Sequence, residues 1–261
     1  DLGLRGRTAI VCGASSGLGL AAAEVLAEEG ANVAMLARRR EQLELDAGRI
    51  GALAVRGDVT NASDLERLVS KTVEAFGGVD ILVWNGGGPP AGKPSEVSDE
   101  ALESAFELLL RPAVRLVRLC LPYLRQSEAA RIVAITSATV KEPTPHLSLS
   151  NAFRPGLTGW LKTLARELGP EGITVNCVAP GRIDTPRMTE LYGAGGPPPE
   201  ELAQIPLGRM GTPREFGDVV CFLASARAAY VSGTTVLVIT HDHEIADSLP
   251  RQVPMRDGAV V

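Results

Sequence analysis

Short apolar runs alternate along the chain with longer segments in which apolar residues recur every three or four positions. The apolar runs are typical of strands buried on both faces, and the periodic segments are typical of amphipathic helices. We expect strands at 8–12, 32–37, 52–55, 80–84, 131–136, 174–179 and 235–239. We expect helices at 18–29, 41–48, 63–76, 99–126, 154–168 and 213–225, the longest of them bent around Pro112 and Pro122.

Two local features refine the helix boundaries. Ser63 and Glu66 have the spacing of a capping box, which predicts that Ser63 caps the helix at 63–76. Pro155 lacks an N–H group and disfavours helical geometry at the residue before it, so the helix at 154–168 is expected to begin or kink there. A longer loop at 184–209 contains a Pro- and Gly-rich stretch.

The regular alternation of strands and helices predicts one α/β domain over residues 1–238, followed by an atypical tail at 239–261. The strands are almost uniformly apolar, which indicates a doubly wound, mostly parallel Rossmann-type sheet with helices on both faces. A chain of 261 residues is long enough to bury such a core.

Composition excludes several classes of function. The formal net charge of −5 argues against nucleic acid as a partner, and no apolar run reaches the roughly 18 residues that a membrane-spanning helix needs. The four cysteines are widely spaced and form no CxxC pair, so neither a metal site nor a redox site is expected. A reducing cytoplasm is the expected compartment.

A glycine-rich turn directly follows the first expected strand and opens the first expected helix. Residues 12–19 read Cys-Gly-Ala-Ser-Ser-Gly-Leu-Gly. Gly13 permits a tight turn, and Gly17 and Gly19 remove side chains where the backbone approaches a pyrophosphate and where the helix lies against the sheet. The sequence therefore predicts a dinucleotide site, with phosphates at the helix N-terminus. The residues expected to bind there are Gly13, Ser15, Ser16, Gly17, Leu18 and Gly19.

Three arginines follow the second expected strand, at positions 38–40. An acidic residue at this place would favour NAD(H) by accepting hydrogen bonds from the ribose. A cation suits a ribose 2′-phosphate instead, so we expect NADP(H) to be favoured over NAD(H), with Arg38 as the phosphate contact. The alternative is that these residues form only a solvated start to the next helix, and Arg39 and Arg40 are candidates for that role.

Several motifs, in this order and spacing, resemble the short-chain dehydrogenase/reductase family over about residues 4–238. The glycine-rich turn is similar to the family's Thr-Gly-x-x-x-Gly-x-Gly, with Cys12 in place of the threonine. The resemblance implies an adenine contact at Asp58 and Val59, and it equates Asn85-Gly86-Gly87 with the family's Asn-Ala-Gly. It further implies that the nicotinamide carboxamide is held by Pro180, Gly181, Ile183 and Thr185.

The catalytic residues depart from the family's pattern. Ser137 matches the serine that binds the substrate oxygen, but Ser150 and Arg154 stand where the family has the tyrosine and lysine of Tyr-x-x-x-Lys. Leu109 stands where the family usually has an asparagine. A serine hydroxyl is a much weaker acid than a phenol, and a guanidinium cannot relay protons, although it can bind ribose hydroxyls and stabilise negative charge on a carbonyl oxygen. The alternative for Ser150 is a turn or N-cap residue beside Asn151.

Three histidines remain to be placed. His146 has a side chain suited to acid–base chemistry, but its neighbours predict a loop that is exposed or contacts substrate. The tail sequence at 240–243, Thr-His-Asp-His, resembles the end of an ATP-binding cassette transporter ATPase. No phosphate loop of the form Gly-x-x-x-x-Gly-Lys-Ser/Thr occurs, so ATPase function is not expected. His241 and His243 alone are too few ligands for a metal site.

Two functional hypotheses follow. The first is an NADP(H)-dependent oxidoreductase that acts on a small-molecule carbonyl or alcohol, with 3-oxoacyl thioesters as one substrate class, using Ser137, Arg154 and Ser150. Leu147, Leu149 and the loop at 184–209 are expected to form an apolar substrate pocket. The second is a catalytically weak or inactive dinucleotide-binding sensor or scaffold. The resemblance also implies a homo-oligomer, either a dimer or a tetramer, in whose contacts the family's C-terminus takes part.

Overall fold

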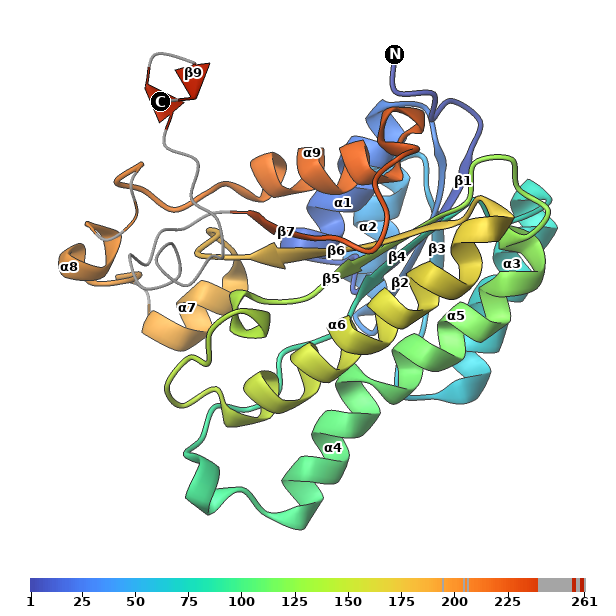
Figure 1. The fold of residues 1–261 in the computed structure, drawn as a ribbon. Helices are drawn as coiled ribbons and strands as arrows, with labels where there is room; N and C mark the ends of the chain where they lie inside the picture. The colour runs from blue at the N-terminus through green and yellow to red at the C-terminus, as the bar shows by residue number, and fades with distance from the viewer. Residues whose placement is uncertain (194, 204, 206, 239–254, 257–258, 261) are drawn as a thin grey trace.

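A parallel sheet forms the centre of the protein (Figure 1). The computed structural model describes residues 1–193, 195–203, 205, 207–238, 255–256 and 259–260. Within these residues, the 7-stranded sheet has the order β3-β2-β1-β4-β5-β6-β7, and all of its neighbouring strands are parallel. The strands are β1 (Thr8–Cys12), β2 (Asn32–Ala37), β3 (Leu53–Arg56), β4 (Ile81–Asn85), β5 (Arg131–Ile135), β6 (Thr174–Pro180) and β7 (Thr235–Val238).

Helices cover both faces of the sheet (Figure 1). One layer contains α1 (Gly17–Glu28), α2 (Arg40–Ile50) and α9 (Pro213–Ala224), and the other contains α3 (Ala62–Phe76), α5 (Arg111–Leu124) and α6 (Ser148–Leu168). The described residues contain three further helices, α4 (Asp99–Leu109), α7 (Pro186–Tyr192) and α8 (Pro199–Leu202). Single 3-10 turns are η1 (Pro94–Glu96), η2 (Ala138–Val140), η3 (Gly169–Glu171) and η4 (Ala226–Ala228), and β8 (Met255–Arg256) pairs antiparallel with β9 (Ala259–Val260).

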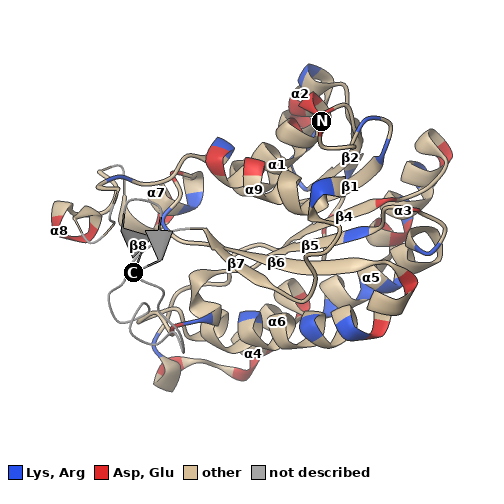
Figure 2. Ribbon diagram, turned by 45° about the horizontal axis from the view of Figure 1, so that its top comes forward, with Lys and Arg blue, Asp and Glu red and all other residues tan. Residues whose placement is uncertain are grey.

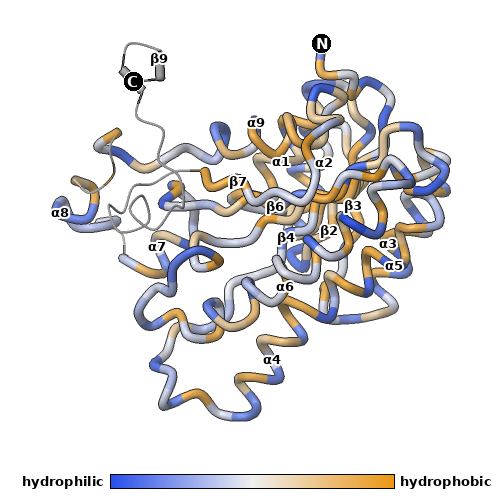
Figure 3. The backbone as a smooth tube through the Cα atoms, in the orientation of Figure 1, coloured by the Kyte–Doolittle hydropathy of each residue, from blue (hydrophilic) through white to orange (hydrophobic). Residues whose placement is uncertain are grey.

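The central strands are buried on both sides, which explains why their sequences are mostly apolar. Ile81 and Val83 of β4 pack in the core cluster beneath α1, α2 and α9, whereas Leu82 and Trp84 pack in the cluster beneath α3, α5 and α6. Figure 3 shows the strands as the hydrophobic centre, and Figure 2 shows the charged residues concentrated on helices and loops. The predicted doubly wound α/β architecture is therefore confirmed.

Two predicted helix boundaries are wrong. The segment at 99–126 is not one bent helix but two, α4 and α5, separated at Leu110. This break places Pro112 in the first turn of α5, where a missing N–H group costs no intrahelical bond. The capping box at Ser63 is also wrong, because the side chain of Asn61 caps α3 and accepts a 3.0 Å hydrogen bond from the Ser63 N–H.

The helix that carries Ser150 and Arg154 begins earlier than expected. It starts at Ser148 and continues through Pro155, so Ser150 lies within α6 and is neither a turn nor an N-cap residue. Long-range contacts fix this start: the Ser148 hydroxyl donates to the Gly92 carbonyl at 2.9 Å, and the Gly92 N–H donates to the His146 carbonyl at 2.7 Å. The loop after β4 therefore determines where α6 begins.

The tail lies mostly outside the described residues. His241, Asp242 and His243 are among the residues that the structure does not describe, so the interpretations placed on them remain predictions. None of the helices in the described ranges combines the length and apolar character that a bilayer crossing requires. In the same ranges, no three His, Cys, Asp or Glu side chains come together as metal ligands.

Candidate active site

A cleft of about 980 Å³ opens at the carboxyl ends of the central strands. This is the edge of a doubly wound sheet at which ligands bind. The glycine-rich turn after β1, the loops after β2, β4, β5 and β6, and the first turns of α6 and α7 all contribute to its walls. Almost every site residue predicted from the sequence lines it: Gly13, Ser15, Ser16, Gly17, Leu18, Arg38, Asp58, Val59, Asn85, Gly86, Ser137, Ser150, Arg154, Pro180, Gly181, Ile183 and Thr185.

Gly19 is the exception, because it lies buried beneath the cleft. A Cβ atom at Gly19 would lie 2.3 Å from the Gly13 carbonyl oxygen. Gly13 itself has φ +61°, and a Cβ there would lie 2.7 Å from Nδ2 of Asn85. The Asn85 side chain donates to the Gly13 carbonyl at 3.4 Å, so the last residue of β4 is hydrogen-bonded to the turn. Gly19 therefore serves helix–strand packing, and Gly13 serves the turn.

The start of α1 forms part of the cleft wall at Gly17. An α-helix begins with N–H groups that have no intrahelical partner, and these groups together with the helix dipole attract phosphate. Gly17 has φ +55°, and a Cβ there would contact Thr185 at 3.5 Å from across the cleft. The two motifs assigned to the cofactor, after β1 and after β6, therefore face each other.

The arginines after β2 play different parts. Arg38 is exposed at the cleft, and its guanidinium lies 3.9 Å from the Asp58 carboxylate. Arg39 also lines the cleft and donates to the Ser15 carbonyl at 3.1 Å. Arg40 pairs with Glu44 on the outer face of α2. Sequence reasoning did not single out Arg39, because a run of arginines does not reveal which member faces the glycine-rich turn.

Hydrogen bonds link Ser137, Thr139 and Ser150 beside the end of β5. The Ser137 hydroxyl accepts a hydrogen bond from the Thr139 N–H at 3.2 Å, and within the described residues its own proton has no acceptor and so can be donated to a ligand. The Oγ of Ser150, which is 6% exposed, lies 3.3 Å from Oγ1 of Thr139. Thr139 therefore links the two serines predicted to be catalytic. It was missed because its role depends on the packing of the η2 turn against α6.

Arg154 connects three parts of the site. Its guanidinium donates to the Thr136 carbonyl at 2.9 Å, to the Ile135 carbonyl at 3.5 Å and to the Gly87 carbonyl at 3.1 Å. Burial, together with the nearby charge of Arg187, lowers the pKa of Arg154 to about 10, so the side chain remains charged at neutral pH. It thus cannot act as a proton relay, but it provides a fixed positive charge at the ends of β4 and β5.

Helix α7 closes the other side of the cleft. Arg182 lines the cleft and pairs with Glu201 of α8, while Arg187 donates to the Pro89 carbonyl at 3.1 Å. Neither arginine was singled out from the sequence, although Arg182 lies between Gly181 and Thr185 and Arg187 follows two residues after Thr185. Leu147 lines the cleft as expected, but Leu149 is buried in the core instead.

His146 is exposed in the loop before α6. It has φ 60°, a left-handed conformation in which histidine is more frequent than most residues. Its neighbours Pro145 and Leu147 both line the cleft. This arrangement supports a loop position for His146, and in the described part of the chain no hydrogen bond joins it to Ser137.

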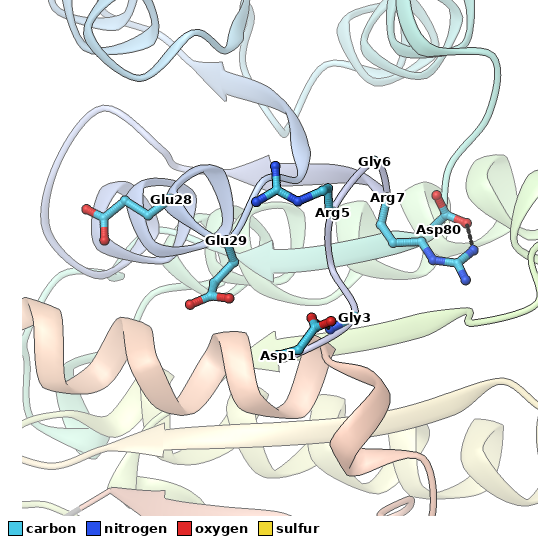
Figure 4. A pocket seen from close by; sticks show the side chains of 8 residues that line it. All are labelled: Asp1, Gly3, Arg5, Gly6, Arg7, Glu28, Glu29 and Asp80. Atoms are coloured by element: carbon cyan, nitrogen blue, oxygen red, sulfur yellow. Dashed lines mark hydrogen bonds and ion pairs between the residues drawn. The ribbon is translucent and has the colours of Figure 1, made fainter.

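A second cavity, of about 690 Å³, lies at the opposite edge of the sheet beside the N-terminus (Figure 4). Charged side chains of both signs surround it, among them Arg5, Arg7 and Asp80. The Asp80 carboxylate is already engaged, because it accepts from the Thr8 N–H at 2.8 Å and from Arg7 at 3.5 Å. These contacts tie the strand starts together, and the cavity lies away from the edge at which cofactors bind in this kind of sheet.

Comparison with known proteins places this site in a family. A family model described as Enoyl-(Acyl carrier protein) reductase matches residues 13–239. The 3-oxoacyl-[acyl-carrier-protein] reductase FabG of Vibrio cholerae is 34% identical over 239 residues, which cover 91% of this chain and 97% of the relative.

Two solved structures are similar throughout the fold. L-sorbose reductase of Gluconobacter frateurii, complexed with NADPH and L-sorbose, matches with TM-score 0.85 and 33% identity over 91% of this chain and 97% of its own. A NADPH-bound short chain oxidoreductase of Pseudomonas aeruginosa, described as containing an atypical catalytic center, matches with TM-score 0.85, 31% identity and the same coverages of 91% and 97%. By its sequence and by its fold, the chain belongs to the short-chain dehydrogenase/reductase family.

Proposed function

We propose that this protein is an NADP(H)-dependent oxidoreductase that interconverts a carbonyl compound and an alcohol in the cleft described above. The observation that carries the proposal is that one cleft brings together the glycine-rich turn, two arginines after β2, Ser137 and the charged Arg154. The named relatives support it, since they are reductases or NADPH-bound oxidoreductases of the same fold.

The residues present fit a dinucleotide with a 2′-phosphate. Gly13, Gly17 and the start of α1 suit the pyrophosphate, because there the backbone approaches the cleft without a side chain in the way. Arg38 and Arg39 lie at the end of β2, where a ribose 2′-phosphate would meet their positive charge. We therefore infer that NADP(H) is bound in preference to NAD(H).

The remaining cleft residues suit reduction of a carbonyl group. NADPH, when bound, supplies a hydride, and its addition to a carbonyl carbon places negative charge on the oxygen. Ser137 donates a hydrogen bond to that oxygen, and Arg154 supplies positive charge in a half-buried setting where charge is poorly screened. Since neither residue is a good proton donor at neutral pH, the proton that completes the alcohol comes from water in the open cleft.

The substrate side of the cleft is partly apolar. Leu108, Leu147, Met188 and Leu191 line it, and these side chains suit a substrate with a hydrocarbon portion. The relative from Vibrio cholerae is a reductase of 3-oxoacyl groups carried on acyl carrier protein. A 3-oxoacyl-like substrate is therefore a reasonable first choice for assay.

A second candidate function is nucleotide binding without useful turnover. It is favoured by one observation, that Ser150 and Arg154 occupy the tyrosine and lysine positions of the family's common members. The double substitution Ser150→Tyr with Arg154→Lys distinguishes the two functions. Activity that arises only in the double variant supports the binding protein, whereas activity already present in the wild type supports the oxidoreductase.

The experiment that tests the proposal is a titration of the protein with NADPH and with NADH, followed by tryptophan fluorescence. Trp84 is a suitable reporter, because a Cβ atom at Gly86 in the cleft wall would lie 3.1 Å from its ring. Oxidation of NADPH is measured in the same samples with a panel of aldehydes, ketones and 3-oxoacyl thioesters. We expect tighter binding of NADPH than of NADH, and turnover with at least one carbonyl class.

A further inference from the structure

Two arginine side chains contact adjacent glycines of the loop after β4. Arg154, from α6, donates to the Gly87 carbonyl at 3.1 Å. Arg187, from α7, lies against Gly88: a Cβ atom on that glycine would be 3.0 Å from both Cζ and Nε of the guanidinium. The side chain is held there by its 3.1 Å hydrogen bond to the Pro89 carbonyl. Residues of α6 and α7 thus bring two positive charges to neighbouring glycines of one loop.

The acidic groups that line this part of the cleft are each engaged elsewhere or exposed. Glu190 pairs with Arg187 at 2.9 Å, but its side chain is 64% exposed and belongs to the same helix. Arg182 is engaged with Glu201 of α8, and Glu142, which lines the cleft wall, is itself engaged. The contacts that Arg154 makes at Thr136, Ile135 and Gly87 are all with backbone carbonyls, which leave its full charge in place.

Two like charges held close together repel each other, and an anion between them removes the repulsion. Burial lowers the pKa of Arg154, and the nearby charge of Arg187 lowers it further. Arginine is well suited to such a site, because its planar guanidinium forms paired hydrogen bonds with a carboxylate.

We propose that Arg187, together with Arg154, binds a carboxylate group of the substrate, so that the preferred substrates are carbonyl compounds that also carry a carboxylate. Met188 and Leu191 follow Arg187 along the cleft wall and Leu147 lines it from the start of α6, so the carboxylate is expected to be attached to an apolar carbon chain. The location of the reacting carbonyl rests on the proposed function, whereas the anion site rests on the two arginines alone.

The kinetic test compares each of several oxo acids with its own methyl ester, which has the same carbonyl but no charge. In the wild type we expect kcat/KM to be about tenfold or more higher for the acids, the usual effect of a charge-assisted hydrogen bond. In Arg187→Met the ratio of acid to ester should fall towards one. In Arg187→Lys, which keeps the charge but not the planar fork, the ratio should be intermediate.

A matched control removes an arginine from a similar surface ion pair far from the cleft. Arg125 pairs with Glu171 at 2.7 Å and does not line the cleft. Arg125→Met should therefore leave the acid-to-ester ratio unchanged. An equal fall in Arg125→Met and in Arg187→Met would show that overall charge, and not the site, sets the preference, which would overturn the proposal.

Equilibrium binding separates this proposal from the proposed function. Hexanoate and its neutral amide are titrated calorimetrically into the protein, with and without NADP⁺, for the wild type and Arg187→Met. If the wild type binds hexanoate more tightly than the amide and Arg187→Met does not, the carboxylate site is supported, even where no turnover is found. Equal binding of acid and amide in the wild type overturns it. A variant that binds NADPH more weakly but keeps the acid-to-ester ratio assigns Arg187 to the cofactor's phosphates and also overturns it.

Discussion

The close packing beneath the glycine-rich turn makes a quantitative prediction for Gly19→Ala. The new Cβ would lie 2.3 Å from the Gly13 oxygen, 2.8 Å from Nδ2 of Asn85 and 2.9 Å from the Cys12 oxygen. Two of these neighbours are backbone atoms that move only with β1 and the turn. Overpacking of this kind costs about 3 kcal/mol, and the better helix propensity of alanine returns about 1 kcal/mol, so the net loss is about 2 kcal/mol.

Gly48→Ala is the matched control, because Gly48 lies in the helix α2 and a Cβ there meets nothing within 4 Å. It gains the propensity of alanine without the clash, so it should raise the free energy of unfolding by up to about 1 kcal/mol. The two variants should thus differ by about 3 kcal/mol. For a chain of this size that corresponds to about 6–12 °C in Tm.

The assay is thermal unfolding of the two variants and the wild type, combined with NADPH titration. Gly19→Ala should unfold at the lowest temperature and bind NADPH more weakly, because the clash displaces the turn that faces the phosphates. Gly48→Ala should bind NADPH as the wild type does. Equal Tm values for the two alanine variants would refute the packing argument.

Three further predictions concern other parts of the chain. Arg39→Ala should raise the Kd for NADPH about tenfold and leave that for NADH nearly unchanged, as measured by fluorescence titration; equal losses for both would remove the 2′-phosphate role. Asn61→Ala should lower the free energy of unfolding in urea by about 1 kcal/mol, since it removes the cap of α3, and Ser63→Ala should cost less; the reverse order would restore the capping box at Ser63. Hydrogen bonds from Arg209 and Thr212 lower the pKa of Glu215 from 4.5 to about 2, so the carboxylate stabilises the fold above pH 4.5 and this contribution is lost as the pH falls through 2. Glu215→Gln should therefore be less stable than wild type at pH 7, and the difference should close between pH 4.5 and 2; a difference that persists at pH 2 would contradict this assignment.

The features of the fold that were correctly predicted depend on patterns that repeat locally. The strands were found because burial on both faces favours apolar residues at successive positions, as at Ile81, Leu82, Val83 and Trp84 of β4. The glycine-rich turn was found because its glycines are required by backbone geometry, which leaves a direct trace in the sequence. At positions such as Gly13 and Gly19, the residue type itself therefore indicates the structural role.

The errors arose where distant segments decide the outcome. The start of α6 was misplaced because Gly92, far away in the sequence, pairs with the segment around Leu147. Pro112 was taken as a bend because the sequence does not show that Leu110 leaves the helical path.

The arginines of the cleft were incompletely predicted for a similar reason. Arg39 and Arg187 look like ordinary surface charges in the sequence, and only the folded chain brings them to Ser15 and Gly88. In the cleft these two side chains donate to the backbone carbonyls of Ser15 and Pro89, which any residue type provides, so no motif in those segments indicates them.

The most direct test of the proposed function is a single-sample measurement of NADPH binding and NADPH oxidation with a carbonyl panel by the wild-type protein. The account predicts that NADPH binds more tightly than NADH, and that its oxidation yields an equal amount of alcohol. Because Arg154 holds the positive charge of the site, Arg154→Met should lose this turnover. Failure to bind either nucleotide would contradict the account, and tight NADPH binding without turnover of any carbonyl would favour the binding-protein function instead.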